Sequence, residues 1–265
     1  MRVGVITGTG TYALAGIEQH PRERVQTRFG EALVARGARG DVEVLHVSRH
    51  GEGHARLSNH VTHRANIAAL TELGAEAVVG VTVCGAVDPN VPLGSLVVFD
   101  DLHFLSNRLA DGTLCTFHDT AGERRRGHWI YEGPFSDAVR AALLEGCAAG
   151  GLAARDGGCY GHVDGPRFNT RAEIRSLAMA GVTAVSQTAG PETVLCGEAE
   201  LPYGLLGFAT DYANGVTEKA TPVEELLRLI ARSADVFAAV LVATLPLLGD
   251  GRELRPPGVV YRFED

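Results

Sequence analysis

Short apolar runs, bounded by glycine, proline or polar residues, recur along the whole chain. The clearest cover residues 3–6, 77–81, 96–99 and 205–209. Runs of this length with such boundaries are typical of strands that are buried in a sheet. We therefore predict four buried strands, with further strands at residues 160–163 and 182–188 that end in polar side chains.

Apolar residues at helical spacing occupy several of the segments between these runs. Residues 61–73 predict a helix that packs on the sheet, and residues 221–245 predict the longest amphipathic helix, which covers one sheet face. Ser136 is the expected N-cap of a helix that runs to about residue 150. Thr170 and Glu173 have the spacing of a capping box, so another helix should start there.

A predicted hairpin distinguishes this pattern from a doubly wound fold. Residues 32–35 and 42–47 are strand-like and are separated by glycines at 37 and 40, which favours a mixed sheet. The chain has no internal repeat and no low-complexity linker. We expect one α/β domain over residues 1–265, with three layers, a mixed central sheet flanked by helices, and a peripheral tail at 249–265.

Composition narrows the functional classes. The 265 residues are 45% hydrophobic, which suits one large core, and the net charge of −8 argues against a general nucleic-acid binder. The five cysteines are odd in number and lack a CxxC spacing, so reduced thiols are expected. The N-terminus enters a strand at once, and no run approaches the length of a membrane span. These features predict a cytoplasmic protein without membrane contact.

The stretch from Thr82 to Gly94 is a candidate anion site. It lies between two apolar runs and offers a small hydroxyl group at Thr82 and bare backbone at Gly85. Backbone without a side chain can approach an anion closely. We therefore predict that a phosphate ion binds here and that other loops supply its partners.

A glycine-rich segment, Thr7-Gly8-Thr9-Gly10-Thr11-Tyr12-Ala13, follows the first strand. Its backbone N–H groups could converge on an anion, with Thr9 adding a hydroxyl group. The segment also matches GxGxxA, the pattern of an NAD-dependent dehydrogenase. That fold needs an acidic residue at the end of a second strand about 20 residues later. Residues 19–24 are polar, contain a proline and show no strand, which disfavours a dinucleotide site.

Arg49 and His50 stand at the end of a predicted strand beside a glycine. Arginine has a permanent charge and a planar set of donors that match phosphate oxygens, although a structural surface arginine is the alternative. Five histidines fall between residues 46 and 63, but their spacing matches no metal-binding signature. We predict no metal site.

Phe168 and Asp211 are the candidates for binding an organic substrate. Phe168 lies in a loop before a predicted helix, where an aromatic ring is suited to stacking on a ligand. Asp211 follows an apolar strand, and burial there would raise its pKa because desolvation disfavours the charged carboxylate.

Taken together, these loops resemble the trimeric purine nucleoside phosphorylase / methylthioadenosine phosphorylase family. The resemblance follows the family's order and spacing from residue 1 to about 245. It is carried by Gly8-Thr9-Gly10, Arg49-His50-Gly51 with His54, Ala65-Asn66 with Ala69-Leu70, Thr82-Val83-Cys84-Gly85, Gly165-Pro166-Arg167-Phe168 with Arg171-Ala172-Glu173, Thr188 with Pro191-Glu192, and Ala209-Thr210-Asp211-Tyr212.

The resemblance implies phosphorolysis of a purine nucleoside, with inorganic phosphate as co-substrate and no cofactor or metal. It implies Asp211 and His50 as catalytic residues. Phosphate would lie against Thr9, Arg49, His50, Thr82, Val83 and Thr188, and the nucleoside against Phe168, Asn169, Gln187, Asp211 and Ala213. It also implies a homotrimer, or a dimer of trimers, in which His128 reaches the 5′ end of the neighbouring subunit's substrate.

Four departures from the family leave the substrate open. Ala213 stands where methylthioadenosine enzymes usually have a second acid, Gln187 replaces a methionine under the ribose, and Thr62-His63 replaces an Asn-Tyr pair. The tail is also short. Asp211 favours a 6-aminopurine, since an amino group donates to a carboxylate, and 5′-methylthioadenosine is the leading candidate. The alternatives are a 6-oxopurine nucleoside phosphorylase and a non-catalytic nucleoside- or phosphate-binding protein.

Overall fold

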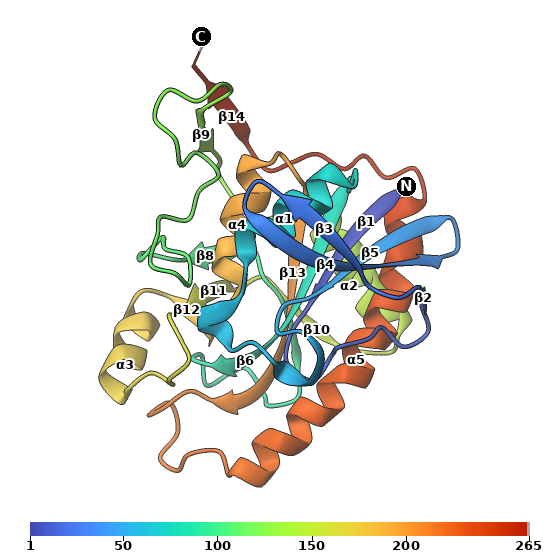
Figure 1. Ribbon diagram of the computed structural model, residues 1–265. Helices are drawn as coiled ribbons and strands as arrows, with labels where there is room; N and C mark the ends of the chain where they lie inside the picture. Colours follow the sequence, from blue (N-terminus) through green and yellow to red (C-terminus); the bar gives the residue numbers. More distant parts are fainter. Residues whose placement is uncertain (264–265) are drawn as a thin grey trace.

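A twelve-stranded mixed sheet runs through the centre of the protein, with helices on both faces (Figure 1). The computed structural model describes residues 1–263, apart from the side chains of Glu18 and Gln19. The main strand order is β10-β7-β13-β6-β1-β5-β4-β2, and β3 pairs with β4 while β12, β11 and β8 continue from β6. The strands are β1 (Arg2–Thr7), β2 (Glu18–Gln19), β3 (Glu23–Thr27), β4 (Gly30–Arg39), β5 (Val42–Ser48), β6 (Ala77–Ala86), β7 (Leu96–Val98), β8 (Asp101–His103), β10 (Ala154–Asp156), β11 (Cys159–His162), β12 (Val182–Ser186) and β13 (Tyr203–Tyr212).

The central strands are apolar along their whole length because both sheet faces are covered. β1 lies parallel to both β5 and β6, and β13 lies parallel to β6. Successive residues of β1 point to opposite faces, so Val5 and Ile6 belong to different hydrophobic clusters. The predicted buried strands are therefore confirmed as the middle of the sheet.

Two helical layers complete the three-layer architecture. The helices α1 (His63–Glu72) and α4 (Ala189–Glu198) pack on one face, and α2 (Asp137–Ala149) and α5 (Val223–Gly249) pack on the other. The short helix α3 (Arg171–Met179) lies beside β12. The predicted α/β fold with a mixed sheet is confirmed, and so is the hairpin, since β4 and β5 pair antiparallel.

The candidate anion stretch that starts at Thr82 begins within a strand and not between two strands. β6 continues through these residues to Ala86, because Gly207–Tyr212 of β13 pairs beside them and Ala184 and Val185 of β12 pair on the other side. β13 pairs along this whole stretch, whereas on the other side β12 pairs only with Gly85 and Ala86 and β1 pairs only as far as Gly80. The anion candidate at Thr82 is thus part of a rigid strand.

The polar segments also hold strands that the sequence analysis missed. β3 covers the region after residue 19, where no strand is expected, and β8 and β9 (Gly127–Ile130) also lie outside the predicted strands. β3 is polar because it is an edge strand with mostly exposed side chains. The dehydrogenase alternative fails for a different reason: residues 8–17 form turns and bends, so no helix begins at the glycine loop.

The two predicted helix caps have different outcomes. Thr170 caps α3, since its hydroxyl accepts from the Glu173 backbone N–H, and the Glu173 carboxylate accepts from the Thr170 N–H at 2.7 Å. Ser136 holds the N-cap position of α2, but its hydroxyl donates instead to the Arg255 carbonyl at 3.3 Å. Both residues therefore hold the predicted N-cap positions, but only Thr170 caps its helix through its side chain.

The chain after α5 returns over the molecule and ends in β14 (Val259–Arg262), which pairs antiparallel with β9. This two-stranded ribbon projects from the body near the C-terminus (Figure 1). Trp129 Nε1 donates to the Pro257 carbonyl at 2.8 Å, which ties the tail to the ribbon. The 249–265 segment thus includes an ordered strand within the described residues.

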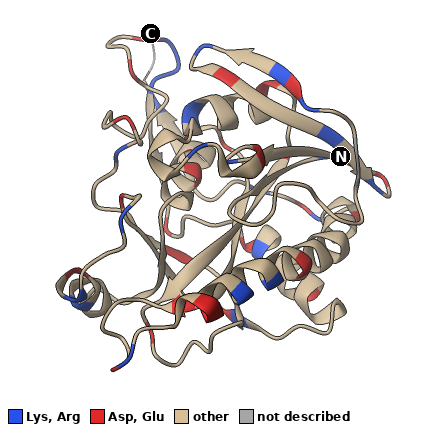
Figure 2. Cartoon of the chain, turned by 60° about the horizontal axis from the view of Figure 1, so that its bottom comes forward, with Lys and Arg blue, Asp and Glu red and all other residues tan. Residues whose placement is uncertain are grey.

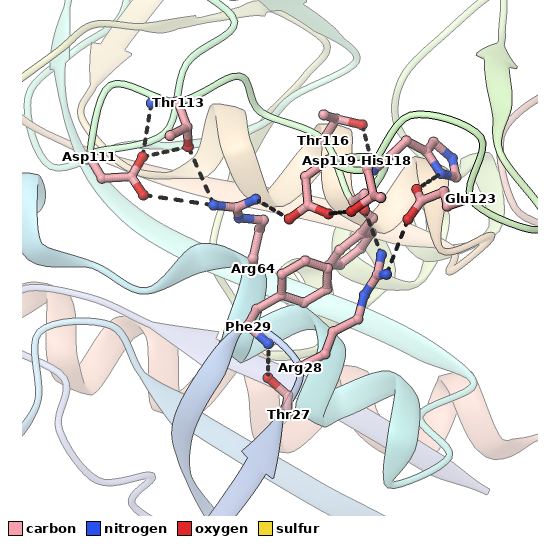
Figure 3. Close-up of polar contacts among 12 residues, drawn as sticks. Thr27, Arg28, Phe29, Arg64, Asp111, Thr113, Thr116, His118, Asp119 and Glu123 are labelled. Atoms are coloured by element: carbon pink, nitrogen blue, oxygen red, sulfur yellow. Dashed lines mark hydrogen bonds and ion pairs between the residues drawn. The ribbon is translucent and has the colours of Figure 1, made fainter.

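Loop 104–126 is anchored to the body by charged side chains (Figure 3). Arg64 of α1 donates to Asp119 at 3.1 Å, and Arg28 of the β3–β4 turn donates to Glu123 at 3.2 Å. Elsewhere, acidic and basic residues are interspersed over the chain in the view of Figure 2. In the described part of the chain, no helix has the length and apolarity needed to cross a membrane.

Candidate functional site

A cavity of about 320 Å³ opens where the central parallel strands end. The carboxyl ends of parallel strands are the usual place for ligands in α/β folds. Most of the residues predicted to bind substrate line this one cavity although they are far apart in the chain. They are Thr9, His50, Thr82, Val83, Phe168, Asn169, Gln187, Thr188, Asp211 and Ala213.

One end of the cavity is formed by small residues and a helix terminus. Gly8 and Thr9 follow β1, and Thr188 precedes α4 as its N-cap residue, with no hydrogen bond from its side chain to the helix. The N-terminus of a ten-residue helix carries a partial positive charge and favours anions. This end is suited to an oxyanion.

Arg49 lies behind this end of the cavity instead of lining it. It is the one predicted phosphate-binding residue that does not line the cavity. Arg49 is 1% exposed, its Nε and Nη2 donate to the Glu192 carboxylate, and Nη1 donates to the Val81 carbonyl at 2.6 Å. A Cβ at Gly8 would lie 2.9 Å from Nη1, so only the bare backbone of Gly8 fits between the guanidinium and the cavity.

His50 lines the cavity in a fixed orientation. Its Nδ1 lies 2.8 Å from the Arg56 carbonyl oxygen, and its ring stacks on His54 with the centroids 4.2 Å apart. Burial lowers the pKa of His50 to about 4, and the charge of Arg49 adds to this effect. His50 is thus a neutral imidazole at physiological pH.

Asp211 supplies the only carboxyl group among the residues that line the cavity. Burial raises its pKa, although the Thr210 hydroxyl, which donates to Oδ1 at 2.9 Å, opposes the shift. Gly85 lies against the carboxyl group, since a Cβ there would be 3.1 Å from Oδ2. A carboxyl group with a raised pKa can serve as a proton donor near neutral pH.

Phe168 and Asn169 lie at the mouth of the cavity, in the loop before α3. Phe168 is 62% exposed, so the ring is free to stack on a ligand. The loop is held by the capping box of α3 and by a hydrogen bond from Asn214 Nδ2 to the Asn169 carbonyl at 2.7 Å. An exposed ring on a fixed loop fits the predicted stacking role.

Gln187 also lines the cavity, and its amide is held on both sides. Ser58 Oγ donates to Oε1 at 2.8 Å, and Nε2 donates to the Arg167 carbonyl at 3.2 Å. A Cβ at Gly165 would collide with both the Gln187 amide and the Ser58 hydroxyl. Gln187 is therefore positioned by three segments and is not a loosely placed surface residue.

The histidines between residues 46 and 63 are dispersed. His46 Nε2 contacts the Thr7 hydroxyl at 2.8 Å, and the buried His63 lies 3.9 Å from Glu192. Among the described residues, no three His, Cys, Asp or Glu side chains are grouped as metal ligands. His128 lies in the β9–β14 ribbon, stacked edge-on against Phe263, and does not line this cavity.

Several cavity residues were missed by the sequence analysis as parts of the site. They are Ser58, Leu226 and Ile230, together with His54 and Thr210, which entered only as parts of motifs. Leu226 and Ile230 are four residues apart on α5, which is a spacing that also marks an ordinary core face. No local signal distinguishes a helix residue that faces a cavity from one that faces a core.

Comparison with known proteins agrees with this architecture. The family model described as the phosphorylase superfamily matches residues 2–246. A 6-oxopurine nucleoside phosphorylase of Pyrococcus furiosus is 31% identical over 252 residues, which cover 93% of either chain. An S-methyl-5′-thioadenosine phosphorylase of Mycolicibacterium smegmatis is 35% identical over 240 residues, which cover 90% of this chain and 84% of that protein.

Among solved structures, the methylthioadenosine phosphorylase of Schistosoma mansoni in complex with adenine has the same fold. Its TM-score is 0.85 at 24% identity, covering 94% of this chain and 91% of that one. The family match spans nearly the whole chain, and the relatives are similar along their full length. This chain therefore belongs to the phosphorylase superfamily.

Proposed function

We propose that the protein cleaves a purine nucleoside by phosphorolysis, giving the free purine and a ribose 1-phosphate. The observation that carries this proposal is the arrangement of one cavity. The cavity combines oxyanion-binding residues, Gly8, Thr9, His50 and Thr188, with one desolvated carboxyl group, Asp211. The strands before Gly8 and His50 lie on one side of β6, and Asp211 belongs to β13 on the other side.

At the oxyanion end, phosphate would accept hydrogen bonds from the glycine loop and from the Thr9 and Thr188 hydroxyls. Thr82 and Val83 form the wall below it, as part of β6. Arg49 would act through its charge from behind Gly8, and Glu192 holds it there. These fixed groups would position phosphate for attack on the anomeric carbon.

At the base end, the C–N bond to the purine breaks as phosphate oxygen bonds to the sugar carbon, and negative charge develops on the departing base. Protonated Asp211 would donate its proton or a hydrogen bond to that base, which typically contributes 10²–10⁴-fold. Phe168 would stack on the purine ring, and Gln187 would lie beside the sugar. This scheme uses no metal or organic cofactor.

For the substrate, we favour a 6-aminopurine nucleoside with an apolar 5′ group, such as 5′-methylthioadenosine. The apolar side chains Leu226 and Ile230 line the cavity from α5, and Ile230 packs on Gly10 of the glycine loop, next to the oxyanion end. The raised pKa of Asp211 supports a second candidate, a 6-oxopurine nucleoside, because a protonated carboxyl group can donate to a keto oxygen.

We also propose that the protein is a cytoplasmic homotrimer, or a dimer of trimers, in which His128 reaches a neighbour's cavity. The β9–β14 ribbon carries His128 away from its own cavity and exposes several large apolar side chains, which favours a covered surface. They are Ile130, Tyr131, Val259, Tyr261 and Phe263. The cytoplasmic location is supported by five free thiols.

Purine release from purified protein tests the function directly. With millimolar phosphate, we expect release of adenine from methylthioadenosine to be faster than release of hypoxanthine from inosine. Faster turnover of inosine would replace the 6-amino assignment with the 6-oxo one. If no nucleoside is cleaved while calorimetry still detects nucleoside binding, the protein is a binding protein and not an enzyme.

A further inference from the structure

His50 presents a hydrogen-bond acceptor, and not a donor, to the oxyanion end of the cavity. The Arg56 carbonyl oxygen can only accept, so the Nδ1 atom at 2.8 Å must carry the ring hydrogen. In a neutral imidazole the other nitrogen then has a lone pair. That nitrogen, Nε2, is directed toward Gly8, 3.9 Å from the position of a Cβ there.

The surroundings of the ring keep it neutral. His50 is 5% exposed, and the groups that act on its charge are His54, Arg49 and Glu192. Burial, His54 and Arg49 all disfavour a positive imidazole, and only Glu192 and the Arg56 carbonyl favour one. Glu192 is already engaged by the two donors of Arg49. Within the described residues, no hydrogen bond engages Nε2.

The other side chains at this end cannot discriminate in the same way. The hydroxyls of Thr9 and Thr188 can rotate either to donate or to accept. Thr82 already donates to the Val83 carbonyl at 3.0 Å. His50 is therefore the group whose hydrogen-bond role is determined before a ligand arrives.

We propose that His50 selects the co-substrate as a protonated oxyanion, which donates its own O–H to the Nε2 lone pair. This inference rests on the proposed function of the cavity as a phosphate site. Hydrogen phosphate and hydrogen arsenate each carry an O–H at neutral pH and satisfy the acceptor. Sulfate has the same tetrahedral form but carries no proton, so one of its oxygens would face the lone pair.

The test compares three anions on the wild-type protein. Affinities for phosphate, arsenate and sulfate would be measured by calorimetry at pH 7.5, at constant ionic strength. We expect arsenate to bind within about tenfold of phosphate, and sulfate at least ~30-fold more weakly, because one buried acceptor is left without a partner. Sulfate binding within threefold of phosphate would overturn the proposal.

Two variants test whether His50 causes the selectivity. In His50→Gln, the amide can turn an N–H toward the anion, so the ratio of phosphate to sulfate affinity should fall below about fivefold. His60→Gln is the matched control, because His60 is an exposed histidine that does not line the cavity, and its ratio should stay near that of wild type. An unchanged ratio in folded His50→Gln, verified by thermal melting, would contradict the assignment. If that variant does not fold, the wild-type anion series decides.

The outcomes separate this inference from the proposed function. If phosphate binds in preference to sulfate but no nucleoside is cleaved, the selectivity stands and phosphorolysis fails. If purine is released with phosphate while sulfate competes equally well, phosphorolysis stands and the role of His50 as a selective acceptor fails.

Discussion

Arg49 and Glu192 form a buried ion pair between residues 143 positions apart in the chain. Nη2 of Arg49 donates to Oε2 of Glu192 at 2.7 Å, Nε donates to Oε1, and Tyr203 donates a further hydrogen bond to Oε2 at 3.1 Å. The pKa of Arg49 stays above its usual range because Glu192 outweighs the effect of burial. The pair joins the end of β5 to α4 directly behind the cavity.

Replacing Glu192 by glutamine should strongly destabilise the protein. The guanidinium would remain buried without a counter-charge, which costs about 3–5 kcal/mol. Urea unfolding would measure the loss. Glu145→Gln is the control, because Glu145 pairs with Arg252 on the surface and should contribute less than about 1 kcal/mol. If both variants lose the same free energy of unfolding, the buried pair stabilises the protein no more than the surface pair does.

Asp211→Ala should lower kcat by about 10²–10⁴-fold, while the affinity for phosphate changes less than about threefold. Single-turnover purine release and phosphate calorimetry would measure the two effects. Thr210→Val is a useful companion, because it removes the hydroxyl that lowers the carboxyl pKa and keeps the acid itself. An unchanged rate in Asp211→Ala would refute the acid role.

The same carboxyl group predicts two pH dependences. Burial raises the pKa of Asp211, so the folded state binds this proton more tightly than the unfolded state does. Stability and the rate due to the protonated acid should therefore both fall as pH rises through the raised pKa. Asp211→Asn should remove both changes, so the melting temperature of the variant relative to wild type should increase as pH rises through this pKa. Identical pH profiles for variant and wild type would assign the titration to another group.

Gln187→Met should raise the KM for the nucleoside about tenfold, as expected for the loss of one hydrogen bond to the sugar. Ser58→Ala removes one hydrogen bond that holds the Gln187 amide, but the amide keeps its own donors and acceptor. The increase in KM should therefore be smaller in this variant. Steady-state kinetics at saturating phosphate separate the two. A KM in Gln187→Met that equals or falls below the wild-type value would mean that the amide obstructs the sugar.

Thr170→Ala should cost about 1 kcal/mol, because the first turn of α3 loses its capping hydroxyl. Ser136→Ala is the matched comparison: Ser136 has the same position on α2 but its side chain does not cap that helix. Chemical denaturation of both variants should show the larger loss for Thr170→Ala. The reverse order would mean that the Ser136 contact with the tail outweighs the cap.

His128→Ala should change the preference of the enzyme for the 5′ substituent of the nucleoside. The kcat for a nucleoside without a 5′ modification should stay within about threefold of wild type. The reason is that His128 does not line the cavity of its own chain. The ratio of kcat/KM for methylthioadenosine to that for adenosine is the measurement, with light scattering to establish the oligomer. A constant ratio would argue that the ribbon does not reach a neighbour.

The sequence by itself was sufficient for the elements that depend on local or periodic patterns. The apolar run at Ala77–Val81 indicates a buried strand whatever surrounds it, and the Thr170–Glu173 spacing indicates a capping box because both partners lie within one turn. It also placed Asp211 at the end of an apolar strand, from which the direction of its pKa shift follows. The order and spacing of the motifs along the chain indicated the family.

Only the tertiary structure decided which partners these residues have. Thr82–Gly85 is a strand because β13 pairs along it and β12 pairs with Gly85, and the polar β3 is a strand because it pairs with β4. Neither pairing is encoded locally. The sequence shows an arginine at position 49, but not whether its side chain contacts a bound anion or a carboxylate of the protein. Its partner in the folded chain is the carboxylate of Glu192, 143 residues away. The acceptor role of His50 likewise depends on where the Arg56 carbonyl lies. Pairing, burial and proton position arise between distant segments, so they follow only from the folded chain.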